Sequence, residues 1–292
     1  MMIDFCNPES LDSPKLFDLL GRIIRLDHAE FTGVYHTLRR AFEQTTAVPF
    51  QKDYVRKALT LINPDLLPAA KPVHPGIDLP CWIEAPNSNQ TIVLLGQDPL
   101  RDADYFTAPA GTPPYVVIGT PFSVHSQALR TTGNQPRYWA VIERLLGAGY
   151  GLYLTDIAKF WASGQRAPRP AAATTYSTIL RGELDLVSRS RRPVFVVTFG
   201  IPAARALYAL LGVPLLATTR LSESKAEVES VGSMLVIRVL HPSSQNTPKM
   251  GGYLARNDVD PVKGVAGLAD VIKQAIGRFG RHDGPKEATA RV

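Results

Sequence analysis

The chain is poor in cysteine and has neither an acidic surplus nor a long apolar run. Of its 292 residues only Cys6 and Cys81 are cysteine, which excludes a disulfide-stapled scaffold and any four-cysteine zinc or iron–sulfur site made by this chain alone. No apolar run reaches the roughly 20 residues of a membrane span, and the opening MMIDFCNPES lacks the basic start of a secretory signal. We therefore expect a cytoplasmic protein with no membrane partner, no metal and no other cofactor.

The charge balance is basic. Lys and Arg total 32 against 26 Asp and Glu, which gives a formal net charge of +6. A basic surface attracts polyanions, and nucleic acid is the usual one. Part of the surplus lies at the end of the chain, where residues 281–292 are expected to form a basic tail. Charge alone therefore leaves open both DNA binding and a merely solvated terminus.

Two changes in the sequence pattern divide the chain. Apolar positions recur at helical spacing within residues 13–62, which indicates two or three helices. An extended connector should follow, because closely spaced prolines interrupt helices and central strands; they stand at 64, 68, 72, 75 and 80. We divide the chain into an N-terminal helical region and connector (1–80), a main domain (81–280) and the tail (281–292).

Short apolar runs alternate with amphipathic helical patterns in the main domain. The runs are TIVLL, YVVIG, GLYLT, PVFVVTF and MLVIRVL, and the helical patterns are RYWAVIERLLGAG, TYSTILRGELDLVSRS, IPAARALYALLG and VKGVAGLADVIKQAIGRF. Near-continuous apolar strands between helices indicate a parallel sheet that is covered on both faces. We predict an α/β fold, a three-layer α/β/α architecture with a central, mostly parallel sheet, plus an N-terminal helical extension.

Polar residues directly follow three of these strands. Asp98 comes just after TIVLLG, Asp156 follows GLYLT, and His241 follows MLVIRVL. Ligands of open parallel sheets bind beyond the carboxyl ends of the strands, so these side chains form a candidate active site. Each segment could separately be a turn or a helix cap, but their coincidence on one edge favours a site.

These segments resemble the signature motifs of the uracil-DNA glycosylase superfamily. The similar segments, in order, are GQDP (96–99), GTPFSV (119–124), YLTDIAK (153–159), VVTFGIPAARALYALLG (196–212) and HPS (241–243). The resemblance covers about residues 90–245 and does not extend to 1–80. It implies a DNA glycosylase that hydrolyses the N-glycosidic bond of a base flipped out of the duplex.

The resemblance also implies roles for single residues. Asp98 occupies the family's position for the carboxylate that stabilises the sugar cation, and His241 that of the donor to the departing base. The implied base-binding residues are Gln97, Leu100, Phe122, which would stack on the base, and Asp156. The DNA-contacting candidates are Arg101, Arg130, Arg166, Ser243, Ser244, Gln245 and Lys249. Gln245 or Asn246 occupies the family's apolar wedge position, unless Met250 inserts instead.

Two positions depart from the uracil pattern. Asp156 stands where the family's uracil readers usually carry Asn; an ionised carboxylate only accepts hydrogen bonds, so it would suit the exocyclic amine of cytosine. The main uracil branch has a Tyr at the position of Leu100, and that Tyr excludes a 5-substituent. The smaller Leu100 leaves room for one. Both changes indicate a cytosine-type base with a 5-modification, as on foreign or phage DNA.

Three alternatives stay open. Lys159 could pair with Asp156, one helical turn away, which would make this strand end structural. A protonated Asp156 could donate to a carbonyl, as a uracil-DNA glycosylase of base-excision repair would need. The fold could also bind modified DNA without cleaving it, although the presence of both Asp98 and His241 favours an enzyme. We expect a monomer.

Overall fold

The computed structural model describes residues 4–5, 13–44, 53–67, 75–84, 88–97, 111–131, 135–161, 170–189, 193–215 and 220–282. Four of the predicted site residues, Asp98, Leu100, Arg101 and Arg166, lie outside the described residues, as does most of the predicted tail.

The described part of the chain is built on a seven-stranded sheet of order β1-β4-β7-β5-β9-β11-β10. Four inner strands run parallel to one another: β7 (Tyr150–Asp156), β5 (Gln90–Gly96), β9 (Val194–Phe199) and β11 (Met234–Val239). The outer strands pair antiparallel with their neighbours: β1 (Asp4–Phe5), β4 (Cys81–Glu84) and β10 (Val228–Val231). Nearly every residue of the inner strands is buried, as a sheet covered on both faces requires.

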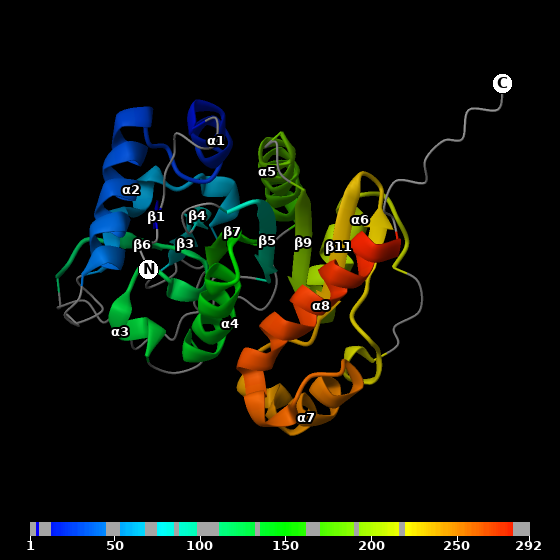
Figure 1. Cartoon of the computed structure of the whole chain (residues 1–292). Coiled ribbons are helices and arrows are strands. Elements are labelled where there is room, and N and C mark those ends of the chain that lie inside the picture. The colour runs from blue at the N-terminus through cyan, green and yellow to red at the C-terminus, as the bar shows by residue number, and fades with distance from the viewer. Residues whose placement is uncertain are drawn as a thin grey trace.

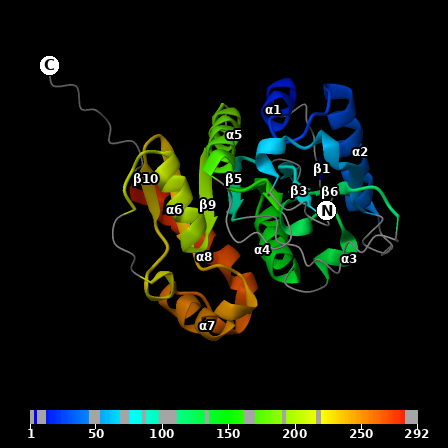
Figure 2. The ribbon, with the colours of Figure 1, turned by 180° about the vertical axis from the view of Figure 1, so that it is seen from behind.

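Helices cover both faces of this sheet. α4 (Gln135–Gly147) and α8 (Gly267–His282) lie on the face toward the viewer in Figure 1, and α5 (Pro170–Ser188) and α6 (Gly200–Leu210) lie on the face seen in Figure 2. α7 (Thr247–Arg256) and the 3-10 helices η8 (Ser244–Asn246) and η9 (Pro261–Ala266) connect β11 to α8. The predicted three-layer α/β/α fold is confirmed. Within the described chain, no helix is long and apolar enough to cross a membrane.

A second, smaller sheet joins the N-terminal region to the main domain. Its strands, in the order β2-β6-β3-β8, are β2 (Val55–Ala58), β6 (Tyr115–Gly119), β3 (Gly76–Asp78) and β8 (Phe160–Trp161). The helices α1 (Ser13–Leu20) and α2 (His28–Glu43) bury apolar side chains in the same core as the main sheet. The packing therefore continues across the sequence boundary near residue 80.

Three predictions of secondary structure are wrong in detail. The run YVVIG belongs to the small sheet, as β6. Residues 54–62, predicted to be helical, contain β2 and the 3-10 helix η3 (Leu59–Leu61), because pairing with β6 prevails over a weak local helical preference. The proline-rich connector includes the 3-10 helix η4 (Pro64–Leu66) and the strand β3.

A buried ion pair ties the end of β7 to α5. Lys159 and Glu183 have fully buried side chains, and the Lys159 Nζ lies 2.8 Å from Glu183 Oε2. Thr155 donates its hydroxyl to the same oxygen at 2.7 Å and accepts a hydrogen bond from Lys159. Lys159 therefore forms its ion pair with Glu183, and the alternative in which it pairs with Asp156 is wrong.

Removing one partner of this pair should strongly destabilise the protein, because the other charge stays buried. We expect Lys159→Met to lower the free energy of unfolding by about 3–5 kcal/mol, and a Lys159→Met/Glu183→Leu double variant to recover most of that loss. Urea unfolding measures both. As a control, Arg39→Ala breaks the exposed Arg39–Glu43 pair and should cost at most about 0.5 kcal/mol. A loss below about 1 kcal/mol for Lys159→Met would contradict a dry, ionised pair.

Candidate active site

The carboxyl ends of the inner strands bring the described site residues to one edge of the sheet. Gly96, the last residue of β5, is in register with Asp156, the last residue of β7. His241 follows β11, and β9 lies between β5 and β11. Gln97, Asp156 and His241 therefore share the edge at which ligands of parallel sheets bind.

Gly96 makes room for both Asp156 and Phe122. A Cβ added at Gly96 would overlap Asp156 Oδ1 and would lie 3.2 Å from Cε1 and Cζ of Phe122. The Asp156 carboxylate is almost completely buried, with 2% of the residue exposed. The carboxylate therefore lies beside the edge of the Phe122 ring, where it can meet the edge of a ring stacked on Phe122.

The backbone that carries Phe122 is strained. Phe122 has φ 56° and Ser123 has φ 52°, a left-handed conformation that costs a residue with a side chain about 1–2 kcal/mol. Two residues of the N-terminal region hold this turn. Tyr54 Oη lies 3.0 Å from Ser123 Oγ, and Ser126 donates to the buried Asp53 at 2.5 Å. The N-terminal region thus holds the turn that carries Phe122, a role that no sequence motif indicates.

His241 presents a hydrogen-bond donor to the site. Its Nδ1 accepts the backbone N–H of Ser243 at 3.2 Å, which assigns the proton of the neutral ring to Nε2. Burial lowers the pKa of His241 and so favours the neutral ring. Asn246 donates to the His241 carbonyl at 3.0 Å and steadies the loop. At Gly200 the φ of +82° and the absence of a side chain let α6 start directly beside His241.

A cluster of four aromatic rings extends from Phe122 to His241 and includes Tyr138 and Phe199. Phe122 stacks on Tyr138 of α4, with ring centroids 4.8 Å apart and planes inclined by 23°. Phe199 is T-shaped to both rings, with its ring centroid 5.7 Å from that of Phe122 and 6.0 Å from that of Tyr138. Tyr138 Oη lies 3.2 Å from Nε2 of His241. Tyr138 was not predicted as a site residue, because its place in an amphipathic helical pattern is typical of a packing residue.

The predicted DNA contacts fall into two groups. Ser244, Gln245 and Lys249 are exposed in the segment that follows His241, and Ser243 in that segment is half-buried. Arg130 instead packs between Phe42 and Trp139, with its guanidinium 4.7 and 4.6 Å from the two ring centroids. This cation–π arrangement joins α2 to the short helix α3 (Gln127–Arg130) and to α4, so the structure gives Arg130 a packing role.

The residues of the HPSSQNTPKM loop also differ in their suitability as a wedge between bases. Met250 of α7 is 3% exposed and packs in the core, so it is not available to insert into DNA. The alternative that named Met250 as the wedge is wrong. Asn246 is used in bracing His241. Gln245 is the exposed side chain of the three, so a polar insertion remains the prediction.

The fold defines an α/β protein with a candidate ligand site at the carboxyl ends of its parallel strands, and a family model matches it. The model of the uracil DNA glycosylase superfamily matches residues 84–258, more than half of the chain, so the chain belongs to that superfamily. No curated protein matches the chain significantly. The matched range includes every predicted site residue, and membership supports DNA binding and a DNA glycosylase type of activity in general.

A methyl group at Gly96 should disturb the site through overpacking. We expect Gly96→Ala to lower the free energy of unfolding by about 1–3 kcal/mol, because the Asp156 carboxylate and the Phe122 ring must move. Thermal unfolding measures the effect. Gly33→Ala is the matched control: its Cβ would meet nothing within 4 Å in α2, and it should stabilise the protein by up to about 1 kcal/mol. Equal stability of Gly96→Ala and wild type would contradict the close approach at Gly96.

Proposed function

We propose that the protein is a DNA glycosylase that excises a flipped cytosine-type base with a 5-substituent and leaves an abasic site. Asp156 carries the proposal: a buried carboxylate at the edge of the Phe122 ring, where uracil readers of the superfamily place an amide. A base stacked on Phe122 would meet a pure acceptor at this point.

Hydrolysis breaks the bond between C1′ of the sugar and N1 of the pyrimidine. The bonding electrons leave with the base, so negative charge develops on the ring and positive charge on the sugar. His241 donates a hydrogen bond from its Nε2–H to the 2-carbonyl of the departing base, keeps that proton, and so stabilises the anion. Water adds to C1′, and one of its protons passes to the base or to solvent.

The sugar cation needs a partner of opposite charge. Asp98, next in the chain after Gln97, is assigned that role from the motif GQDP, and its carboxylate would also orient the attacking water. Gln97 lies directly after β5, beside the start of the segment after Asp156: its carbonyl accepts the N–H of Ala158 at 3.0 Å. The end of β5 is therefore tied to the segment that follows Asp156.

The choice of base follows from Asp156 and Leu100. A carboxylate accepts from the exocyclic amine of cytosine and repels the 4-carbonyl of uracil. Lys159, the nearest cation along the chain, is engaged by Glu183. Leu100 replaces a tyrosine that would exclude 5-substituents. Removal of unmodified cytosine would destroy the host genome, so selectivity for a modification on foreign DNA fits a role in antiviral defence. We further propose that the protein acts in the cytoplasm as a monomer.

A panel of oligonucleotides tests the activity. It contains uracil, cytosine, 5-hydroxymethylcytosine and glucosylated 5-hydroxymethylcytosine in duplex and single-stranded form, and alkali reveals abasic sites. We expect cleavage at a modified cytosine and no activity in Asp98→Asn. Cleavage at uracil alone would identify a repair enzyme, and binding without cleavage on every substrate would identify a non-catalytic binder.

Removal of the anion-stabilising donor should slow the chemical step. We expect His241→Ala to reduce the single-turnover rate by about 100-fold or more, with little change in DNA affinity. The exposed His36 of α2 provides the control, since His36→Ala should leave the rate unchanged. An unchanged rate in His241→Ala would rule out the role given to Nε2.

Replacing the carboxylate of Asp156 by an amide should change the preferred base. An amide can donate to a 4-carbonyl, so Asp156→Asn should shift preference from cytosine-type toward uracil-type bases by about 5- to 150-fold, the equivalent of 1–3 kcal/mol. Competitive cleavage of mixed oligonucleotides measures the ratio. The exposed Asp185 of α5 offers a charge-matched control in Asp185→Asn.

A second variant separates the two specificity elements. Leu100→Tyr should reject bulky 5-substituents and spare unsubstituted bases, because the ring would fill that space. If wild type already prefers uracil and Asp156→Asn leaves the ratio unmoved, the assignment of Asp156 is wrong.

A further inference from the structure

Tyr138 lies where the proposed function puts the flipped base. Its ring stacks on Phe122 at 4.8 Å and meets the His241 ring edge-on, with centroids 5.8 Å apart and an interplanar angle of 87°. Its hydroxyl oxygen lies 3.2 Å from Nε2 of His241. Phe122 and His241 are the two residues that would stack on the base and donate to it.

Each of these contacts is one that a pyrimidine would need. The phenol and the pyrimidine are both planar six-membered aromatic rings, and each offers an oxygen to the Nε2 proton. Because His241 Nδ1 accepts the Ser243 N–H, the neutral ring donates through Nε2 to the Tyr138 oxygen. That one proton and that face of Phe122 cannot serve the phenol and a base together.

We propose that Tyr138 is a gate of the base site: its phenol fills the site in the absence of DNA, and the entering base displaces it. The inference rests on the proposed function, since it takes the contacts of the flipped base from there. It assigns Tyr138 a role in specificity.

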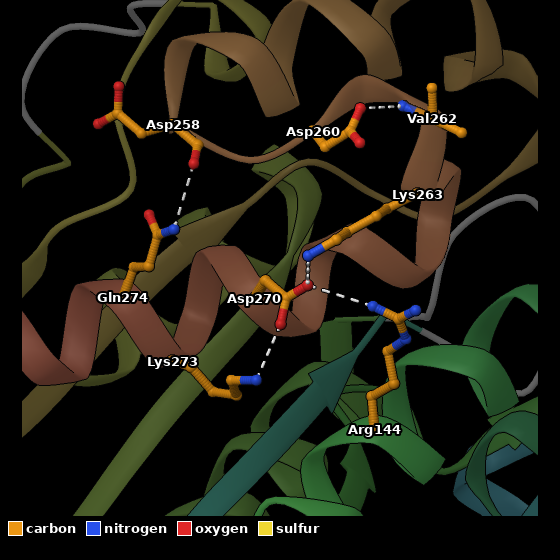
Figure 3. A network of polar contacts seen from close by, with 8 residues as sticks. All are labelled: Arg144, Asp258, Asp260, Val262, Lys263, Asp270, Lys273 and Gln274. Atoms are coloured by element: carbon orange, nitrogen blue, oxygen red, sulfur yellow. Dashed lines mark hydrogen bonds and ion pairs between the residues drawn. The ribbon is translucent and has the colours of Figure 1, made fainter.

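The gate opens by rotation of a side chain, because α4 is fixed at both ends. Arg137 donates to Thr247 of α7 at 2.7 Å. Arg144 donates to Asp270 of α8 at 3.1 Å, and Figure 3 shows Lys263 and Lys273 on the same carboxylate. Tyr138 itself lies in the first turn of α4 and is only part-buried, so its side chain can turn toward solvent while the helix stays in place.

Displacement of Tyr138 sharpens the choice of base. Every base must replace the stack on Phe122 and the hydrogen bond of His241. A phenol has one polar group, and this group is turned to His241. A base that also brings an exocyclic amine to Asp156 gains a contact that the phenol cannot offer. Bases without this amine compete with Tyr138 at a disadvantage.

Equilibrium binding to two duplexes tests the gate. One carries 5-hydroxymethylcytosine on a 2′-fluoroarabinose sugar, which resists cleavage, and the other carries tetrahydrofuran, which has no base, at the same position. Tyr138→Phe loses the hydrogen bond to His241 and should tighten the base-containing duplex relative to the tetrahydrofuran duplex by about 2- to 10-fold. Tyr138→Ala should tighten it at least as much. Tyr150→Phe, at the opposite end of β7, should leave the ratio unchanged.

The outcomes separate the gate from the proposed function. A ratio that is unmoved or lowered in both Tyr138 variants overturns the gate, and a slower single turnover with that ratio would identify Tyr138 as a positioning residue for His241. If cleavable substrates yield no alkali-labile sites but the Tyr138 variants still raise the affinity ratio of the two duplexes, the proposed activity is wrong and the gate is supported. Failure of every variant to bind either duplex overturns both. Urea unfolding of the variants confirms that each is folded.

Discussion

The strands β7, β5, β9 and β11 pair in parallel, and this register brings the candidate site together. Neighbouring parallel strands end at the same edge of the sheet, so side chains that are far apart in the sequence lie close together there. The pairing of Gly96 with Asp156 places a carboxylate beside the stacking ring, and the turn after β11 places an imidazole donor across from it. The helices on both faces and the buried Lys159–Glu183 pair keep these strand ends in place.

Much of the fold could be predicted, because buried parallel strands and amphipathic helices have distinct periodicities. The four inner strands correspond to the apolar runs TIVLL, GLYLT, PVFVVTF and MLVIRVL. The prediction failed where tertiary pairing decides the outcome. Val55–Ala58 has helical spacing but pairs with β6, and β3 forms within a proline-rich stretch, in a sheet whose partners come from distant parts of the chain.

The candidate site was predictable at strand ends and unpredictable elsewhere. Asp156 and His241 follow apolar runs, a signal that the sequence carries. Tyr138 comes from a helix and reaches the site through packing, and Asp53 and Tyr54 act through the loop of Phe122, so none of them has a local signature. Arg130 illustrates the converse case: a basic residue predicted to contact DNA packs between Phe42 and Trp139, which its sequence position does not indicate. A residue that directly follows a parallel strand can be placed at the sheet edge from the sequence. A residue that reaches the site through packing, such as Tyr138, is found only in the structure.

We propose that the edge formed by Phe122, Asp156 and His241 receives a flipped base. A crystal structure of the Asp98→Asn variant with a duplex containing 5-hydroxymethylcytosine tests this proposal. We expect the base to lie outside the helix and to stack on Phe122, with its exocyclic amine at Asp156, its 2-carbonyl at His241 Nε2 and Tyr138 turned away. A base that remains stacked in the duplex, or that lies elsewhere with the phenol of Tyr138 still on Phe122, would contradict it.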